Sequence, residues 1–164
     1  MDTNKKHPYM GAICLGLHDA LVSVLGLGTG LTVAMAERMT IVLTAIIASA
    51  AAAISMTASQ YLAEKTNNNR KHAIRSGIAT GMSYITTAFC QILPFMFLEN
   101  NYVSLILMYI ISVMIIVMFN VLVSRARKTR FLPNFLEMLG ICSGVTVAAF
   151  VIGAAAKIWL GLEI

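Results

Sequence analysis

Long stretches without any Asp, Glu, Lys or Arg constrain the fold of this chain more than any other feature. Three such stretches span residues 40–63, 76–98 and 101–124. A helix needs about 20 apolar residues to cross the hydrocarbon layer of a bilayer, so each stretch is long enough. Two further stretches, 8–36 and 131–156, are apolar except for His18 and Asp19 in the first and Glu137 in the second.

Composition agrees with a membrane location, because only 12% of the residues are charged, whereas soluble domains average about 25%. A backbone in lipid must satisfy its own hydrogen bonds, and the stretches lack the alternation of a barrel strand. We therefore predict an all-α polytopic membrane protein with five transmembrane helices. The connections are too short for a soluble domain, so residues 1–164 form a single transmembrane domain. The predicted helices cover approximately residues 8–36, 40–63, 74–98, 101–124 and 131–160.

The basic residues are unevenly divided between the two sides of the predicted bundle. Arg38 and Lys157 fall on one side, and the other ten of the 12 Lys and Arg residues fall on the side of the N-terminus. Because basic residues favour the cytoplasmic side, the N-terminus is predicted to be cytoplasmic and the C-terminus to lie on the opposite side. The net charge of +5 thus reflects topology and contact with anionic lipid headgroups, and no nucleic-acid partner is expected. The ten residues are Lys5, Lys6, Lys65, Arg70, Lys71, Arg75, Arg125, Arg127, Lys128 and Arg130.

Several other classes of protein are disfavoured. Cys14, Cys90 and Cys142 lie inside predicted spans without paired spacing, which argues against a disulfide framework or a zinc finger. The first apolar stretch is much longer than the roughly 7–15 residues of a signal-peptide core, so we expect it to be retained. No nucleophile–base pair or cofactor motif occurs in an accessible loop, so we expect neither an enzyme nor a permanently bound cofactor.

Asp19 lies in the stretch "GLHDALVSVLGLGTGL" (16–31), well inside the membrane. An ionisable group at that depth costs about 2.5–3.5 kcal/mol and indicates a functional site. The carboxylate can ligate a cation, carry a proton or pair with a buried base. Ser23, Gly26 and Gly30 share its helical face. The GxxxG spacing of the two glycines allows close approach of another helix, either the same helix of a second subunit or a neighbour in ordinary packing.

The second predicted helix places Ser49, Ala53, Met56 and Gln60 on one face. The Met56 thioether suits a transition metal that sheds water, and Gln60 offers an amide oxygen. Packing is nevertheless the more typical role of a methionine in a membrane helix, and the chain contains 11 methionines. We therefore treat this face as a possible lining of an ion pathway.

Three further residues are weaker candidates. Cys14 and His18 are four residues apart on the first helix, and with the neighbouring aspartate they could bind Zn, Fe or Mn. Packing of Cys14 and a hydrogen bond from His18 to a neighbouring helix are the favoured alternative. Glu137 could attract metal at the cytoplasmic mouth, but pairing with Arg125 or Arg127 is favoured.

The stretch from residue 16 to residue 31, followed by "AAAISMTASQYLAEK" at residues 51–65, resembles the first two helices of the vacuolar iron transporter family. The resemblance implies a homodimer that exports Fe²⁺, and in some members Mn²⁺, from the cytosol in exchange for protons. It implies that Asp19 binds the ion and releases it when protonated, and that Met56 favours a softer cation. The expected location is the cell inner membrane or a vacuole-type membrane.

The sequence departs from the family pattern at three places. The glycine that follows the family's aspartate is Ala20, and the glutamate that well-studied plant members carry eight residues before the methionine is Ala48. The family's cytoplasmic metal-binding domain is replaced by the basic segment "KTNNNRKHAIR" (65–75), which repels cations. A non-transporting membrane scaffold or partner-binding protein therefore remains the alternative function.

Overall fold

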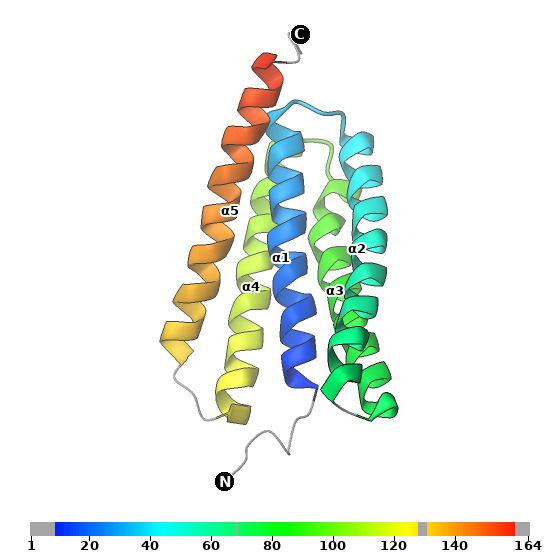
Figure 1. Ribbon diagram of the computed structural model, residues 1–164. Coiled ribbons are helices and arrows are strands. Elements are labelled where there is room, and N and C mark those ends of the chain that lie inside the picture. Colours follow the sequence, from blue (N-terminus) through cyan, green and yellow to red (C-terminus); the bar gives the residue numbers. More distant parts are fainter. Residues whose placement is uncertain (1–8, 68, 128–130, 160–164) are drawn as a thin grey trace.

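The structure, a computed structural model, describes residues 9–67, 69–127 and 131–159 and consists of five long helices lying side by side (Figure 1). No strand occurs among these residues, which confirms the prediction of an all-α chain. The helices are α1 (Met10–Val33), α2 (Arg38–Asn67), α3 (Arg70–Phe97), α4 (Asn101–Arg127) and α5 (Phe131–Trp159).

Four of these helices, α1, α2, α4 and α5, are long and apolar enough to cross a membrane. The length and composition of these helices agree with four of the five predicted spans, whereas α3 is not among the four and its span stays a prediction. The physical reason is the composition of α3, which carries many side chains with hydroxyl or amide groups. Several of these polar side chains are buried against neighbouring helices. Those buried side chains include Thr80, Tyr84, Thr87 and Gln91.

Helices α2 and α3 extend past their apolar stretches and form a helical hairpin. α2 continues to Asn67 and α3 begins at Arg70, four residues beyond the predicted limits of 63 and 74 on either side. Charged residues can stay helical outside the lipid, and the Asn69 side chain caps α3 by accepting a hydrogen bond of 3.3 Å from the Lys71 N–H. The basic segment between the two apolar stretches is therefore largely helical.

Glycine and small polar residues bring α1 and α2 close to α3. A Cβ atom added at Gly77 would lie 2.7 Å from the Thr57 carbonyl oxygen on α2. On the α1 side, the Thr80 hydroxyl donates to the Ala12 carbonyl at 3.1 Å, and the Ser83 hydroxyl donates to the Ile13 carbonyl at 2.8 Å. Because the two hydroxyls reach the backbone of the neighbouring helix, α1 and α3 are held at close distance.

The structure places both glycines of the GxxxG motif against α5 of the same chain. A Cβ atom added at Gly26 would lie 3.3 Å from the Val145 side chain, and one added at Gly153 would lie 2.6 Å from the Gly30 carbonyl oxygen. The motif therefore serves packing within the chain, and its contact with a second subunit stays a prediction. Figure 1 shows α5 running along one side of α1.

The contact between α1 and α3 yields a prediction for Gly16, where a Cβ atom would collide with the Thr80 backbone carbonyl. We expect Gly16→Ala to lower the unfolding free energy by about 1–3 kcal/mol, because the two helices must move apart. Thermal unfolding of the purified protein in detergent measures the effect. Gly11→Ala is the matched control on the same helix, since nothing lies within 4 Å of a Cβ atom there. Equal unfolding midpoints for the two variants would contradict the packing argument.

Candidate functional site

A cavity of about 130 Å³ lies at the junction of α1 and α2, with Tyr84 of α3 in its wall. Its polar lining consists of Ser23, Ser49 and Tyr84, and the alanines of α2 leave the space open. Liquid water takes up about 30 Å³ per molecule, so the cavity has room for a few waters or for a partly hydrated ion. Its remaining lining residues are Val24, Leu27, Ala45, Ala48 and Ala52.

Asp19 lies beside this cavity, one helical turn before Ser23. It is nine residues after Met10, the first residue of α1, which places it about 13 Å along the helix. The Tyr84 hydroxyl forms a hydrogen bond with the Ser23 side chain and interacts electrostatically with Asp19. A carboxylate and two hydroxyls from α1 and α3 thus lie in the same region of the bundle, well inside α1. Such oxygen atoms are ligands for divalent cations and partners for bound water.

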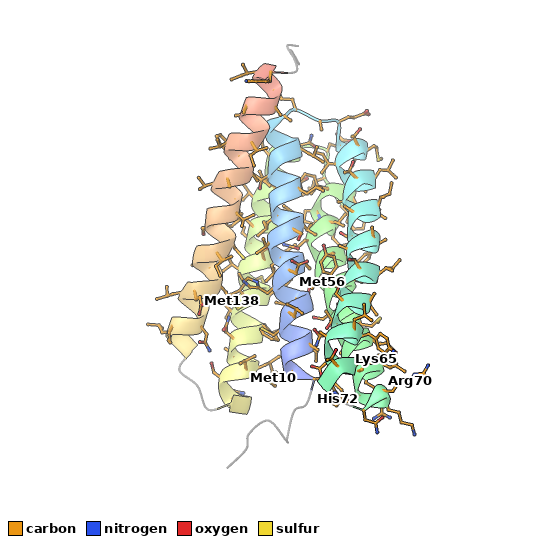
Figure 2. The ribbon with its side chains drawn as sticks, viewed as in Figure 1. Met10, Met56, Lys65, Arg70, His72 and Met138 are labelled. Atoms are coloured by element: carbon orange, nitrogen blue, oxygen red, sulfur yellow. The ribbon has the colours of Figure 1, made fainter. Side chains whose placement is uncertain are left out.

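Met56 and Gln60 lie at other levels of the bundle. The Thr80 hydroxyl donates to the Ala12 carbonyl, and a Cβ atom at Gly81 would meet the Thr57 side chain, so Ala12 and Thr57 are at similar heights. Because α2 runs opposite to α1, Met56 is at the height of Ile13 and therefore about six residues, or roughly 9 Å, away from Asp19 along the bundle. Figure 2 shows Met56 beside α1, and its side chain is partly buried against the core. The predicted pathway residues form a column in one protomer and not a single coordination shell.

Gln60 belongs to a polar cluster at the end of the bundle where α2 ends and α3 begins. Its amide nitrogen donates to the Ser76 hydroxyl at 3.0 Å and to the Glu64 carboxylate at 3.5 Å. The other carboxylate oxygen of Glu64 lies 3.6 Å from His72 Nδ1, and the Tyr9 ring lies 5.1 Å from the His72 ring. Only the amide oxygen of Gln60 can bind a cation, because an amide N–H group is a donor.

The set formed by Cys14, His18 and Asp19 does not assemble into a metal centre within one chain. Over residues 9–67, 69–127 and 131–159, no three His, Cys, Asp or Glu residues come close enough to hold a metal ion. All three side chains are half-buried on α1. Any metal site at this level needs other ligands, such as the hydroxyls of the cavity, water or residues of a second copy.

Comparison with known protein families identifies a match. The profile of the VIT family matches residues 10–76 and 65–154, which together cover most of the chain. The chain belongs to the VIT family. The two matched segments overlap at residues 65–76, from the end of α2 to the beginning of α3. No curated protein matches the chain.

Two parts of this VIT site were missed by the sequence reasoning. Tyr84 adjoins Ser83 and Thr87, whose polarity within a membrane stretch was the available signal. His72 was overlooked because the basic segment was considered only for its repulsion of cations, and Glu64, just before that segment, was not considered. The spacing of four residues from Gln60 to Glu64 places both on one face of a helix, and it would have indicated the cluster.

A buried amide supports the VIT site from the side of α4. The Gln91 amide nitrogen donates to the Ser112 hydroxyl at 2.7 Å and to the Leu21 carbonyl at 3.4 Å. Gln91 is fully buried, so these bonds form away from competing water. The two hydrogen bonds connect α3 with α4 and with α1. The acceptor on α1, Leu21, is two residues after Asp19, so the bond fixes the height of the carboxylate relative to Tyr84 on α3.

Glu137 is an exposed residue of α5 in this VIT chain. No ion pair of Glu137 occurs among the side chains that the structure describes, which include Arg125 but not Arg127. Its neighbour Met138 (Figure 2) accepts a hydrogen bond of 3.1 Å from the Asn120 side chain on α4. This contact joins α5 to α4 and leaves Glu137 facing outward, where it remains a candidate for attracting cations.

Proposed function

We propose that this VIT family protein is a divalent transition-metal transporter that exports Fe²⁺, or Mn²⁺, from the cytosol in exchange for protons. Membership of the family supports a membrane metal-ion transporter. The observation that carries the proposal is the position of Asp19 on α1, where its charge acts on Tyr84 beside a cavity lined by Ser23 and Ser49. An acidic group at this depth of an apolar helix is costly, and this cost indicates a role in binding an ion or a proton.

The proposed pathway follows the column of polar and sulfur-bearing side chains. A cation enters at the end near Gln60, passes the Met56 thioether and binds the Asp19 carboxylate. The hydroxyls of Ser23 and Tyr84 can replace part of its hydration shell. A proton and a metal ion compete for one carboxylate, so protonation of Asp19 releases the ion and couples the two fluxes. A thioether favours Fe²⁺ over harder cations such as Mg²⁺.

The proposed topology has five spans, a cytoplasmic N-terminus and the C-terminus on the opposite side. Inclusion of α3 is supported by its place between α1, α2 and α4, because its polar side chains are buried and need not face lipid. The orientation rests on the excess of basic residues at one end. The location is the cell inner membrane or a vacuole-type membrane.

We also propose a homodimer. In one protomer Ser23 is exposed and Asp19 is only half-buried, so an isolated copy would present a carboxylate to lipid. A second copy packed along this face of α1 would remove the carboxylate from lipid and could add ligands to the ion site.

The topology predicts that Asn69 and Asn100, at the two ends of α3, lie on opposite sides of the membrane. In a background with alanine at the three native cysteines, Asn69→Cys is expected to react with an impermeant maleimide from the cytoplasmic side only. Asn100→Cys is expected to react from the other side only. Labelling of both positions from one side would show that α3 does not cross the bilayer.

Asp19→Asn is expected to reduce metal flux by about tenfold or more. Loss of a residue that only hydrogen-bonds to a metal ligand already lowers metal affinity or activity by about that factor. Purified protein in liposomes is tested for Fe²⁺, Mn²⁺ and Zn²⁺ uptake with an imposed pH gradient. Glu99→Gln, which changes an exposed acid outside the helices, is the matched control and should keep wild-type flux. Absence of flux from folded wild-type protein would favour the scaffold or partner-binding function, and gradient-independent flux would refute proton exchange.

Met56→Ala is expected to lower Fe²⁺ flux several-fold while leaving Mn²⁺ flux less affected, because a thioether ligand matters most for the softer cation. The same liposomes measure both ions in competition. Met114→Ala removes an equal side chain from an exposed position on α4 and should leave the ratio of the two fluxes unchanged. If Met56→Ala and Met114→Ala behave alike, Met56 is a packing residue.

A further inference from the structure

A second, larger hollow lies on the outside of the bundle between α2 and α3. It has a volume of about 430 Å³ and is separate from the cavity beside Asp19. Its lining is apolar, and the hydroxyl of Thr57 within it donates to the Ala53 carbonyl at 2.7 Å. Gly81 lies where the two helices touch beneath the hollow, because a Cβ atom there would collide with Thr57. The bulkier lining residues are Ile54, Tyr61, Ile78, Met82 and Ile85.

Each of the two helices that line this groove carries exposed basic residues on the same helical face, beyond one end of the groove. On α2 the stripe runs from Ile54 through Tyr61 to Lys65, and on α3 it runs back from Ile78 to Lys71 and Arg75. All three basic side chains are exposed. The Lys65 ammonium lies 5.7 Å from the centre of the Tyr61 ring, so it sits directly at the end of the groove. Figure 2 shows Lys65 at this end of the bundle.

We propose that the groove and its three bases bind one anionic glycerophospholipid. An acyl chain lies in the groove, and the phosphate contacts Lys65, Lys71 and Arg75. The dimensions agree, because Ile78 to Ile85 covers roughly 10 Å of helix, and one leaflet of the hydrocarbon layer is about 15 Å thick. Tyr61 lies between the apolar groove and the three bases, in the position that aromatic residues favour at the membrane interface.

Charge distinguishes this occupant from a second copy of the chain. A two-fold interface through the α2–α3 face would bring the three bases close to the same three bases of the other copy. Such like charges repel each other and disfavour the contact. An anionic headgroup is complementary to the same residues, and a zwitterionic lipid gains much less from them.

Native mass spectrometry of the protein released from nanodiscs of equal phosphatidylglycerol and phosphatidylcholine content tests the charge recognition. Wild-type protein is expected to retain phosphatidylglycerol over phosphatidylcholine by about tenfold or more, given three basic contacts. The triple variant Lys65→Gln/Lys71→Gln/Arg75→Gln should lose this preference. Arg125→Gln removes an exposed base from α4, away from the groove, and should keep the preference. Equal retention of the two lipids by wild type, or an unchanged preference in the triple variant, would overturn the proposal.

A second pair of variants tests the groove. Ala58→Trp fills the groove and should abolish lipid retention with all bases in place, while Ala51→Trp adds the same side chain at an exposed position of α2 outside it. Circular dichroism confirms that each variant is folded. Retention by Ala58→Trp equal to that of Ala51→Trp would refute the acyl-chain contact. Disulfide cross-linking of Ile54→Cys between copies would show that a second copy covers the groove and would equally overturn the proposal.

Discussion

The polarity of α3 is the constraint on which the bundle depends. Hydroxyl and amide groups buried among apolar helices are stabilised by partners on neighbouring helices, because no water reaches them there. In this chain Thr80 and Gln91 reach backbone carbonyls of α1, and glycines let α2 approach closely enough to cover another side of α3. The heights of α1 and α2 relative to α3 follow from these contacts. The position of Asp19 relative to Tyr84 is thus a consequence of how α3 is buried.

The number and approximate extent of the helices could be predicted from the sequence, because charge-free stretches report directly on the hydrocarbon layer. The sequence did not predict which helices pack against each helical face. Gly26 and Gly30 show why, since a GxxxG spacing indicates close approach without naming the helix that approaches, and here that helix is α5. The ends of α2 and α3 were missed because helix formation continues outside lipid, where hydropathy carries no information.

In the candidate site, too, some residues could be recognised from the sequence and others only from the structure. Asp19 stands out in the sequence because an acid in an apolar stretch is rare and costly. Tyr84 does not, because its role depends on a hydroxyl reaching Ser23 across a helix interface. Met56 is intermediate: the family resemblance singles it out, but its height in the bundle appears only when the contacts of Thr57 and Gly81 are known. Residue types were thus predictable, and registers between helices were not.

The α2–α3 hairpin has two chemically different faces, and their closeness matters for the proposed pathway. Gln60 and Glu64 carry the polar contacts on one face, while Lys65 belongs to the basic end of the outer groove. Lys65 lies at the same end of the bundle as Gln60, and charges act over about 8 Å at physiological salt, so the bases oppose entry of a divalent cation there. A lipid phosphate held by the same bases would cancel part of that positive potential. In a chain with so short a connection, the membrane itself would then supply the negative charge that cation entry requires.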